Sequence, residues 1–263
     1  MIKDGVNDIQ RDHLERVIRW AGRIRDHLSH IERHLDLPVW FRPSSTGVAV
    51  IGLTPQAPQR GRSGFRNVAR LERDLQRIFE RHCTGVAQDR PTPEKQLQSF
   101  LILGALRAHR RLVPLEEAAR RGGAPVDLFF MVDEISLPLA AGRIVCDLLA
   151  VRAVSGGYVP AVIELKSARQ KQRLIRQVTD YATYVDRHAD LFERLFEAVS
   201  PFPIRLIGPC EKWIVWPHAG LERDPQADDL AARGIRTVGY AEDGSRFRFI
   251  DGARDDRARG ATA

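Results

Sequence analysis

The sequence predicts a mixed α/β fold, and the order of its elements is the main reason. Three apolar runs rich in β-forming residues follow one another at residues 126–139, 143–154 and 158–167. A helical pattern precedes them, another follows them, and a further apolar run stands at residues 212–217. The predicted core therefore consists of a helix, a three-strand meander, a second helix and a strand.

The first 90 residues form a mainly helical region in this prediction. Apolar residues recur at helical spacing from Asp8 to Leu35 and again from Asn67 to His82. Between these helices, Gly47 to Thr54 is typical of a short strand, and a loop rich in Pro, Gly and Arg follows it. The stretch "TGVAQDRPTP" marks a boundary near residue 90. We expect residues 1–90 to serve substrate selection or dimerisation.

Residues 91–250 carry the predicted core. Thr92 and Pro93 suit the N-cap and the first turn of its first helix. The turn Ser155-Gly156-Gly157 joins the second and third apolar runs as a hairpin. The other expected elements are a long helix at 170–199, a strand at 212–217, a short helix at 228–233, a strand pair at 235–240 and 247–250, and a disordered tail at 251–263.

The chain is basic, with a formal net charge of +7 and a pI near 9.8. A basic surface favours a nucleic-acid partner without proving one. Cys83, Cys146 and Cys210 show no CxxC pairing, so neither a zinc site nor a disulfide framework is expected. The N-terminus lacks an apolar signal core and no apolar run approaches membrane-spanning length, so we expect a cytoplasmic protein that binds no membrane.

Acidic and basic residues gather around the second and third apolar runs. Glu164 and Lys166 are two residues apart on a strand, so their side chains point to the same face. The predicted hairpin places Asp147 beside Glu164, which brings two carboxylates together with one ammonium group. Such a cluster is costly to desolvate unless a cation lies between the carboxylates. Oxygen ligands suit a hard divalent ion, so we expect Mg²⁺ or Mn²⁺ at this point.

These residues resemble the active-site motif of a known nuclease family. Asp147, followed seventeen residues later by Glu164-Leu165-Lys166, is similar to the motif of the PD-(D/E)XK nuclease superfamily. The family core has the element order predicted above, so the resemblance implies an α/β restriction-endonuclease-like core. In this chain Cys146 replaces the proline that often precedes the aspartate, a change that leaves the carboxylate in place.

Further positions extend the resemblance, which covers about residues 91–220. Glu94 stands where members often supply an extra acid from the helix before the meander. Gln177 and Tyr181 have the Gln-x-x-x-Tyr spacing of members related to recombination helicase-nucleases, one helical turn apart on one face.

The resemblance implies a Mg²⁺- or Mn²⁺-dependent nuclease that hydrolyses phosphodiester bonds in DNA. Its metal ligands would be the carboxylates of Asp147 and Glu164 and the main-chain carbonyl of Leu165. Lys166 would act on the attacking water or on charge at phosphorus. The remaining motif residues would supply an accessory acid and orient the site or the substrate: Glu94, Gln177 and Tyr181.

A basic run opens the helix after the motif. Arg169, Lys171, Arg173 and Arg176 would grip phosphates beside the metal, and each contact would add to the salt dependence of binding. DNA is the expected partner, with a homodimer or a separate recognition protein as further partners. The same run also fits a solvated helix face.

Each motif residue also has a purely structural interpretation. The Glu164–Lys166 pair fits a surface salt bridge, and Asp147 fits a turn acid or a hydrogen-bond acceptor in the core. Glu94 suits the dipole at a helix N-terminus, and the Gln-x-x-x-Tyr pair fits ordinary polar helix positions. The rival functions are a nucleic-acid-binding or protein-interaction module that keeps the fold without catalysis, and a helical adaptor whose charge serves solubility.

Two other patterns have an ordinary explanation. His27, His30 and His34 share a helix face and resemble metal ligands, but a polar or nucleic-acid-facing surface explains them without a metal. Trp213 and Trp216 fit platforms for stacked bases. Three positions separate them on a strand, so they point to opposite faces and at least one is expected in the core.

Overall fold

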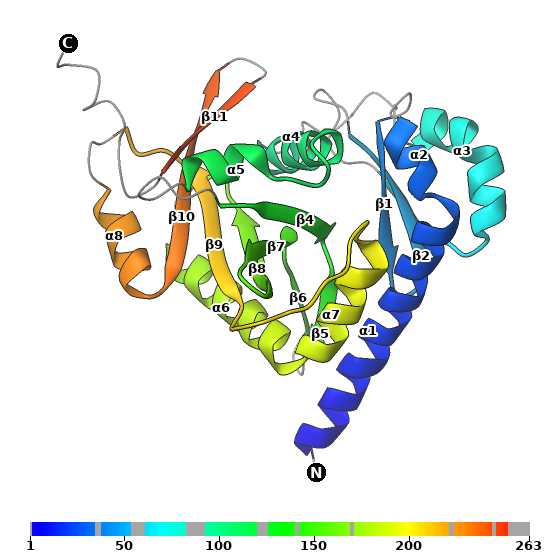
Figure 1. Ribbon diagram of the computed structural model, residues 1–263, viewed down its shortest axis with the longest axis horizontal. Helices are drawn as coiled ribbons and strands as arrows, with labels where there is room; N and C mark the ends of the chain where they lie inside the picture. The colour runs from blue at the N-terminus through cyan, green and yellow to red at the C-terminus, as the bar shows by residue number, and fades with distance from the viewer. Residues whose placement is uncertain are drawn as a thin grey trace.

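The protein is described by a computed structural model (Figure 1). The structure describes residues 2–34, 38–53, 61–82, 93–119, 126–139, 142–168, 171–220, 224–243 and 246–251. Within these ranges it contains eight helices and a mixed sheet of six strands, together with two smaller sheets. The predicted α/β class is confirmed.

The six-stranded sheet forms the centre of the molecule, in the order β11-β10-β9-β8-β7-β4. β4, β7 and β8 are antiparallel neighbours, β9 runs parallel to both β8 and β10, and β11 is antiparallel to β10. The strands are β4 (Leu128–Asp133), β7 (Leu148–Val154), β8 (Gly157–Leu165), β9 (Glu211–Pro217), β10 (Ile235–Asp243) and β11 (Arg246–Asp251).

Helices cover the sheet on both sides. In Figure 1, α4 and α5 lie above it, α6 and α7 lie below it, and α8 lies beside β10. Apolar side chains from strands and helices fill the space between, including Leu101, Phe130 and Phe192. The helices are α4 (Pro93–Arg107), α5 (Val113–Ala118), α6 (Lys171–Arg187), α7 (Ala189–Val199) and α8 (Pro225–Ala232).

Two of the three predicted meander strands are interrupted. The first run divides into β4 and β5 (Ser136–Leu139), and the second into β6 (Gly142–Val145) and β7. β5 and β6 pair with each other as a separate hairpin. Glu134 stands between β4 and β5 with φ of 47°, a left-handed conformation that an ordinary strand residue does not adopt. The predicted turn after β7 is present, with Gly156 at φ of 86° and Val154 paired with Gly157.

The prediction of one long helix over residues 170–199 was wrong. α6 ends at Arg187 and α7 begins at Ala189. His188 separates them: its amide donates to the Tyr184 carbonyl, while its own carbonyl accepts from the first turn of α7. The break redirects the chain, so that α7 packs along α1 (Ile2–His27).

The N-terminal region contains more β-structure than a mainly helical region would. A three-stranded antiparallel sheet lies between its helices, whereas we predicted a single strand. The first of these strands carries Trp40 and Arg42. The elements are α1 (Ile2–His27), α2 (Ser29–His34), β1 (Val39–Ser44), β2 (Gly47–Gly52), β3 (Gly61–Phe65) and α3 (Val68–His82).

The N-terminal region packs on the central sheet as well as on itself. One cluster of buried residues joins α1, β1, β2 and α3, and includes Leu28, Phe41 and Leu71. Leu14 of α1 and Trp40 of β1 belong instead to the large core shared with the central sheet. The boundary near residue 90 stays a prediction, because residues 83–92 lie outside the described ranges, as does the tail beyond residue 251.

Across the described ranges, no helix is both long enough and apolar enough to cross a lipid bilayer.

Candidate metal-binding active site

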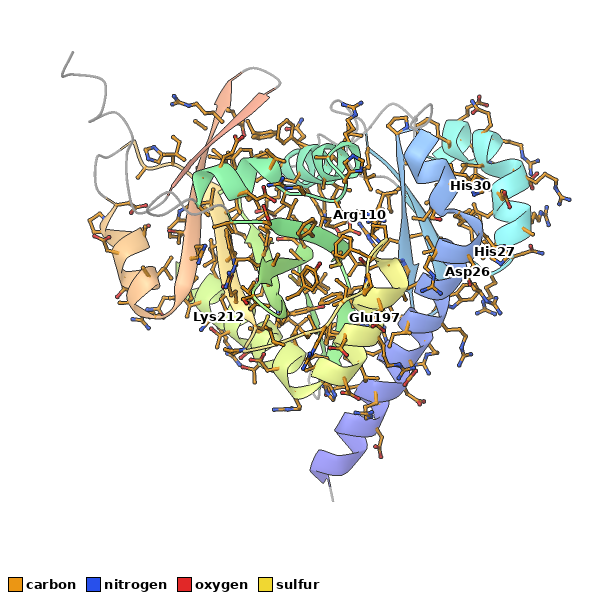
Figure 2. All side chains as sticks on the ribbon, in the orientation of Figure 1. Asp26, His27, His30, Arg110, Glu197 and Lys212 are labelled. Atoms are coloured by element: carbon orange, nitrogen blue, oxygen red, sulfur yellow. The ribbon has the colours of Figure 1, made fainter. Side chains whose placement is uncertain are left out.

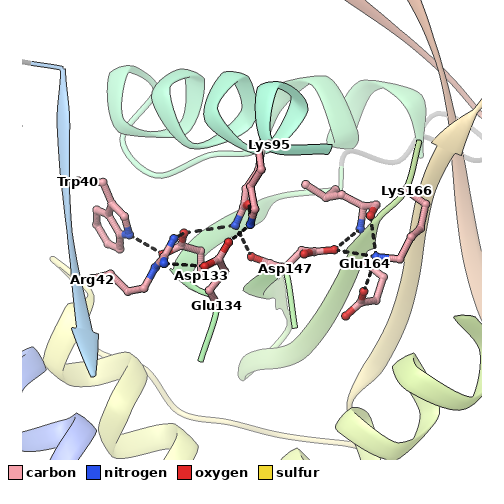
Figure 3. Close-up of polar contacts among 10 residues, drawn as sticks. Trp40, Arg42, Lys95, Asp133, Glu134, Asp147, Glu164 and Lys166 are labelled. Atoms are coloured by element: carbon pink, nitrogen blue, oxygen red, sulfur yellow. Dashed lines mark hydrogen bonds and ion pairs between the residues drawn. The ribbon is translucent and has the colours of Figure 1, made fainter. Parts of the chain in front are cut away.

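The carboxylates of Asp147 and Glu164 come from neighbouring strands, as the hairpin predicts. β7 and β8 pair Leu148 with Ile163, so Asp147, just before β7, lies next to Glu164 near the end of β8. Figure 3 shows both carboxylates turned toward Lys166. The pairing of β7 with β8 and the period of two along the strand together bring Asp147, Glu164 and Lys166 to one place.

The Lys166 ammonium group contacts three oxygens at once. Its Nζ lies 3.3 Å from Asp147 Oδ2, 3.1 Å from Glu164 Oε2 and 2.8 Å from the Leu165 carbonyl oxygen. These are the three groups that the sequence predicts as metal ligands. The Lys166 ammonium group already lies where these three oxygens converge. The same oxygens suit a divalent metal ion.

Glu164 is the most electrostatically strained member of the triad. Its side chain is fully buried, Oε2 accepts hydrogen bonds from Lys166 and Gln177, and Oε1 has no hydrogen-bond partner among the described residues. Burial, together with the charge of Asp147, raises the pKa of Glu164 to about 8, against the opposing effect of Lys166. A buried carboxylate in this state favours a cation close by.

Lys166 stays charged in this environment. Burial acts to lower the pKa of its ammonium group, but the charges of Asp147 and Glu164 outweigh burial and raise that pKa. A lysine in this state donates hydrogen bonds and stabilises negative charge.

The position of Asp147 is set by main-chain contacts. Its Oδ2 accepts a hydrogen bond of 2.8 Å from the Leu165 amide. Its carbonyl oxygen accepts one of 3.0 Å from Gln98 Nε2 and one of 3.4 Å from the Glu134 amide. Contacts from β8, α4 and the end of β4 therefore hold the residue at the start of β7.

Glu94 lies at the edge of the same site. Its Oε1 accepts hydrogen bonds from the Ser167 amide at 3.1 Å and from Ser167 Oγ at 3.2 Å. The Tyr240 hydroxyl donates to the Lys166 carbonyl at 3.1 Å from the other side. The first turn of α4 and strand β10 thus fix the segment that carries Lys166.

Gln177 and Tyr181 serve different parts of the structure, although they share one face of α6. Gln177 Nε2 donates to Glu164 Oε2 at 2.8 Å, so this residue orients a candidate ligand. The Tyr181 hydroxyl donates to the Ile135 carbonyl at 2.8 Å and contacts neither carboxylate. Tyr181 is fully buried, and burial raises the pKa of its phenol. It supports the chain between β4 and β5.

Replacing Tyr181 with phenylalanine should lower the free energy of unfolding by about 1–2 kcal/mol, because the buried Ile135 carbonyl would lose its donor. Tyr184 supplies a matched control three residues along α6. Its hydroxyl is buried without a hydrogen-bond partner among the described residues, so Tyr184→Phe should change stability little. Urea denaturation of both variants measures the difference, and equal stabilities would contradict this role for Tyr181.

The predicted phosphate-gripping residues at the start of α6 are only partly described. Arg169 and the side chains of Lys171 and Arg173 lie outside the described residues. The Arg176 side chain is 87% exposed and forms a 3.5 Å ion pair with Asp180, one turn along the helix. The phosphate-gripping role of this run stays a prediction.

A second polar cluster adjoins the site, and sequence reasoning missed it (Figure 3). Asp133 is fully buried and accepts hydrogen bonds from Trp40 Nε1 at 2.6 Å and from Arg42 Nε at 2.8 Å. Arg42 also donates to Glu134 at 2.6 Å, and Lys95 forms an ion pair with the same carboxylate. The one signal in the sequence was the pair of acids at the end of an apolar strand.

The Gln98 side-chain amide and the Lys95 ammonium group connect this cluster to the triad. Gln98 Nε2 bonds both Asp133 Oδ2 at 3.3 Å and the Asp147 carbonyl at 3.0 Å, and Lys95 donates to Gln98 Oε1 at 2.9 Å. Burial lowers the pKa of the Lys95 ammonium group, although the nearby charge of Asp147 acts to raise it. Lys95 is thus a second cation beside the candidate metal ligands.

The site suits a metal that keeps much of its water shell. Within the described ranges, no group of three or more His, Cys, Asp or Glu side chains lies close enough to hold a metal ion. Asp147, Glu164 and the Leu165 carbonyl offer two carboxylates and one neutral oxygen. Mg²⁺ is commonly held by one or two carboxylates, with water and substrate phosphate completing its octahedron, so these donors fit it.

Of the histidine and tryptophan patterns, the two described histidines lie at the surface, and the two tryptophans lie in the core. His27 and His30 are exposed on α1 and α2 (Figure 2), and His30 Nε2 lies 3.3 Å from a carboxylate oxygen of Glu72 on α3. The side chain of the third histidine lies outside the described residues. Trp213 and Trp216 are both fully buried, so neither is a platform for bases.

No protein-family model matches the chain, and no curated protein or solved structure matches it. The resemblance to the PD-(D/E)XK superfamily therefore stays a prediction from the motif and from the element order of the sequence.

Proposed function

We propose that this protein is a metal-dependent nuclease with a restriction-endonuclease-like core, which hydrolyses phosphodiester bonds in DNA. The observation that carries the proposal is the convergence of Asp147, Glu164 and the Leu165 carbonyl on one cation, the Lys166 ammonium group. The order α4, β4-β7-β8, α6, β9 around these residues supports it, as does the net charge of +7.

Asp147, Glu164 and the Leu165 carbonyl would hold Mg²⁺ or Mn²⁺. The bound ion supplies charge stabilisation at the scissile phosphate and lowers the pKa of a water ligand. Gln177 keeps Glu164 in position through its hydrogen bond, and the Leu165 amide does the same for Asp147. The site is thus held on strands and a helix before substrate arrives.

Lys166 has to leave the position between the carboxylates when a metal binds there. Its ammonium group then orients the attacking water and stabilises the negative charge that develops on the phosphoryl oxygens. The water oxygen forms a bond to phosphorus and releases a proton to solvent, the bond to the leaving oxygen breaks, and that oxygen takes up a proton from solvent. The products are a phosphomonoester end and a hydroxyl end.

Replacing Lys166 with alanine should lower the rate of DNA cleavage by about 10²- to 10⁴-fold, the usual effect of removing a group that positions a proton or a developing charge. Metal binding should persist or strengthen, because Nζ competes with the ion for three oxygens. Labelled linear, nicked, branched and single-stranded DNA, each with Mg²⁺ or Mn²⁺, gives the rates. Titration calorimetry with Mn²⁺ gives the affinity.

Lys212→Ala is a matched control, because this lysine lies on β9 and its Nζ contacts the Arg233 carbonyl. Wild-type protein that binds DNA but cuts none of these substrates with either ion would overturn the proposal. That result would favour the catalytically inactive binding module on the same fold.

A further inference from the structure

A groove lined by arginines lies along α3, in the N-terminal region. It has a volume of about 490 Å³ and is bounded by the end of β3 and by α3. Four of its lining residues are arginines, and the acidic residue among those lining it is Asp74. The arginines, called the α3 arginines below, are Arg66, Arg70, Arg77 and Arg81.

Helical spacing keeps these arginines on one side of α3. Arg70, Arg77 and Arg81 are seven and four residues apart, which is two turns and one turn of helix. They extend over about 16 Å of helix axis. That length equals about five steps of axial rise along one DNA strand, at about 3.4 Å each.

The α3 arginines present their charge to solvent. The Arg70 and Arg77 side chains are 68% and 71% exposed, and Arg66 and Arg81 are exposed as well. In Figure 2, side chains tipped with nitrogen project outward from α3. Solubility does not require four guanidinium groups in one groove, whereas the binding of a polyanion does.

Asp74 offsets part of this charge. It forms ion pairs of 3.3 Å with Arg70 and 3.1 Å with Arg77. Asn67 Oδ1 accepts from the Arg70 amide at 2.9 Å and so caps the helix, whose N-terminal dipole adds positive potential at this end of the groove. The net charge of the residues that line the groove remains strongly positive.

We propose that the α3 groove binds the phosphate backbone of DNA, as a contact separate from the candidate active site. The choice of DNA as the polyanion rests on the proposed nuclease function. In Figure 1 the sheet of β1 and β2 lies between α3 and the central sheet. DNA held in the groove is therefore engaged away from the scissile phosphate, which gives the N-terminal region a role in substrate retention.

A fourfold variant tests this contact: Arg66→Gln, Arg70→Gln, Arg77→Gln and Arg81→Gln. Fluorescence anisotropy with labelled duplex DNA and EDTA measures binding without cleavage, between about 50 and 200 mM salt. The slope of log affinity against log salt should become shallower by about 3 to 4, because about four phosphate contacts are lost. Affinity should fall by at least about tenfold at the lower salt concentration.

A charge-matched control removes four exposed arginines elsewhere: Arg16→Gln, Arg19→Gln, Arg205→Gln and Arg233→Gln. This control variant should keep most of the wild-type slope of log affinity against log salt. Asp74→Asn provides an independent test, because it frees Arg70 and Arg77 and should tighten binding by about two- to fivefold. Affinities for Asp74→Asn and the fourfold variant that both equal the wild-type value would overturn the proposal. If the fourfold variant does not fold, as judged by circular dichroism, Asp74→Asn decides alone.

The two proposals fail in different ways. A wild-type protein that never cuts, but whose DNA binding depends on the α3 arginines, would remove the nuclease function and keep the groove. A protein that cuts DNA and binds it equally well without those arginines would keep the nuclease and remove the groove. Tighter binding of heparin than of duplex DNA, with the same arginine dependence, would overturn the assignment to DNA.

Discussion

Replacing Glu164 with glutamine is expected to abolish DNA cleavage while raising the free energy of unfolding of the metal-free protein. The Glu164 carboxylate is fully buried beside Asp147, and its Oε1 has no hydrogen-bond partner among the described residues. Glutamine has nearly the same shape, still accepts from Lys166 and Gln177, and carries no charge to desolvate. The gain should be about 1–3 kcal/mol at neutral to alkaline pH.

The gain depends on pH in a defined direction. The pKa of Glu164 in the folded protein is about 8, above the ordinary value of 4.5, so between these values the folded state holds a proton that the unfolded state releases. Wild-type stability should therefore fall, relative to the variant, as pH rises from about 4.5 to about 8. Below that interval the difference should be smallest. Urea denaturation with EDTA across the interval measures it.

A divalent cation should reverse the order of stability. Mg²⁺ that binds only the folded wild type stabilises it by about 2.7 kcal/mol at a hundredfold excess over Kd, whereas the variant lacks one ligand charge and gains less. Glu117→Gln, at an exposed position on α5, is the control and should change neither stability nor cleavage. A Glu164→Gln variant less stable than wild type at alkaline pH without metal would show that the buried charge is not a cost to the fold.

The core of the site could be predicted because it depends on local rules. Asp147 and Glu164 lie at positions that a two-residue hairpin brings together, and Lys166 follows on the same face. Gln177 was predicted from the Gln-x-x-x-Tyr resemblance, and its side chain does reach Glu164. In each case the pattern of apolar residues determined the strand or helix, and the geometry of that element determined the direction of the side chain.

The rest of the site could not be predicted, because it depends on contacts between distant segments. Arg42 and Asp133 are 91 residues apart, and Lys95 and Glu134 are 39 apart. No periodicity links such pairs, since β1 and α4 reach the end of β4 from distant parts of the chain. Tyr181 shows the converse limit: its helical position was correct, but the partner of its hydroxyl is the Ile135 carbonyl, in a break between strands that was not foreseen.

Arg42→Ala is expected to destabilise the protein by about 3–5 kcal/mol, the usual cost of leaving a buried charge without its partner. Asp133 is fully buried, and Arg42 contacts both of its oxygens from β1. The loss should also reach the active site. Asp133 and the Asp147 carbonyl share the Gln98 amide, so an unbalanced Asp133 charge draws Gln98 away from Asp147. Cleavage should fall in addition to stability.

A double variant separates the effect of the Arg42–Asp133 ion pair from the effect of side-chain packing. Arg42→Gln with Asp133→Asn removes both charges and keeps an acceptor for Trp40 Nε1, so its stability should lie within about 1.5 kcal/mol of wild type. Urea denaturation of the two single variants and the double variant completes a cycle, whose coupling energy should reach about 2–3 kcal/mol. Cleavage at saturating DNA should recover in the double variant together with stability. Additive single effects would mean that β1 contributes only apolar packing, and that the N-terminal region does not position Asp147.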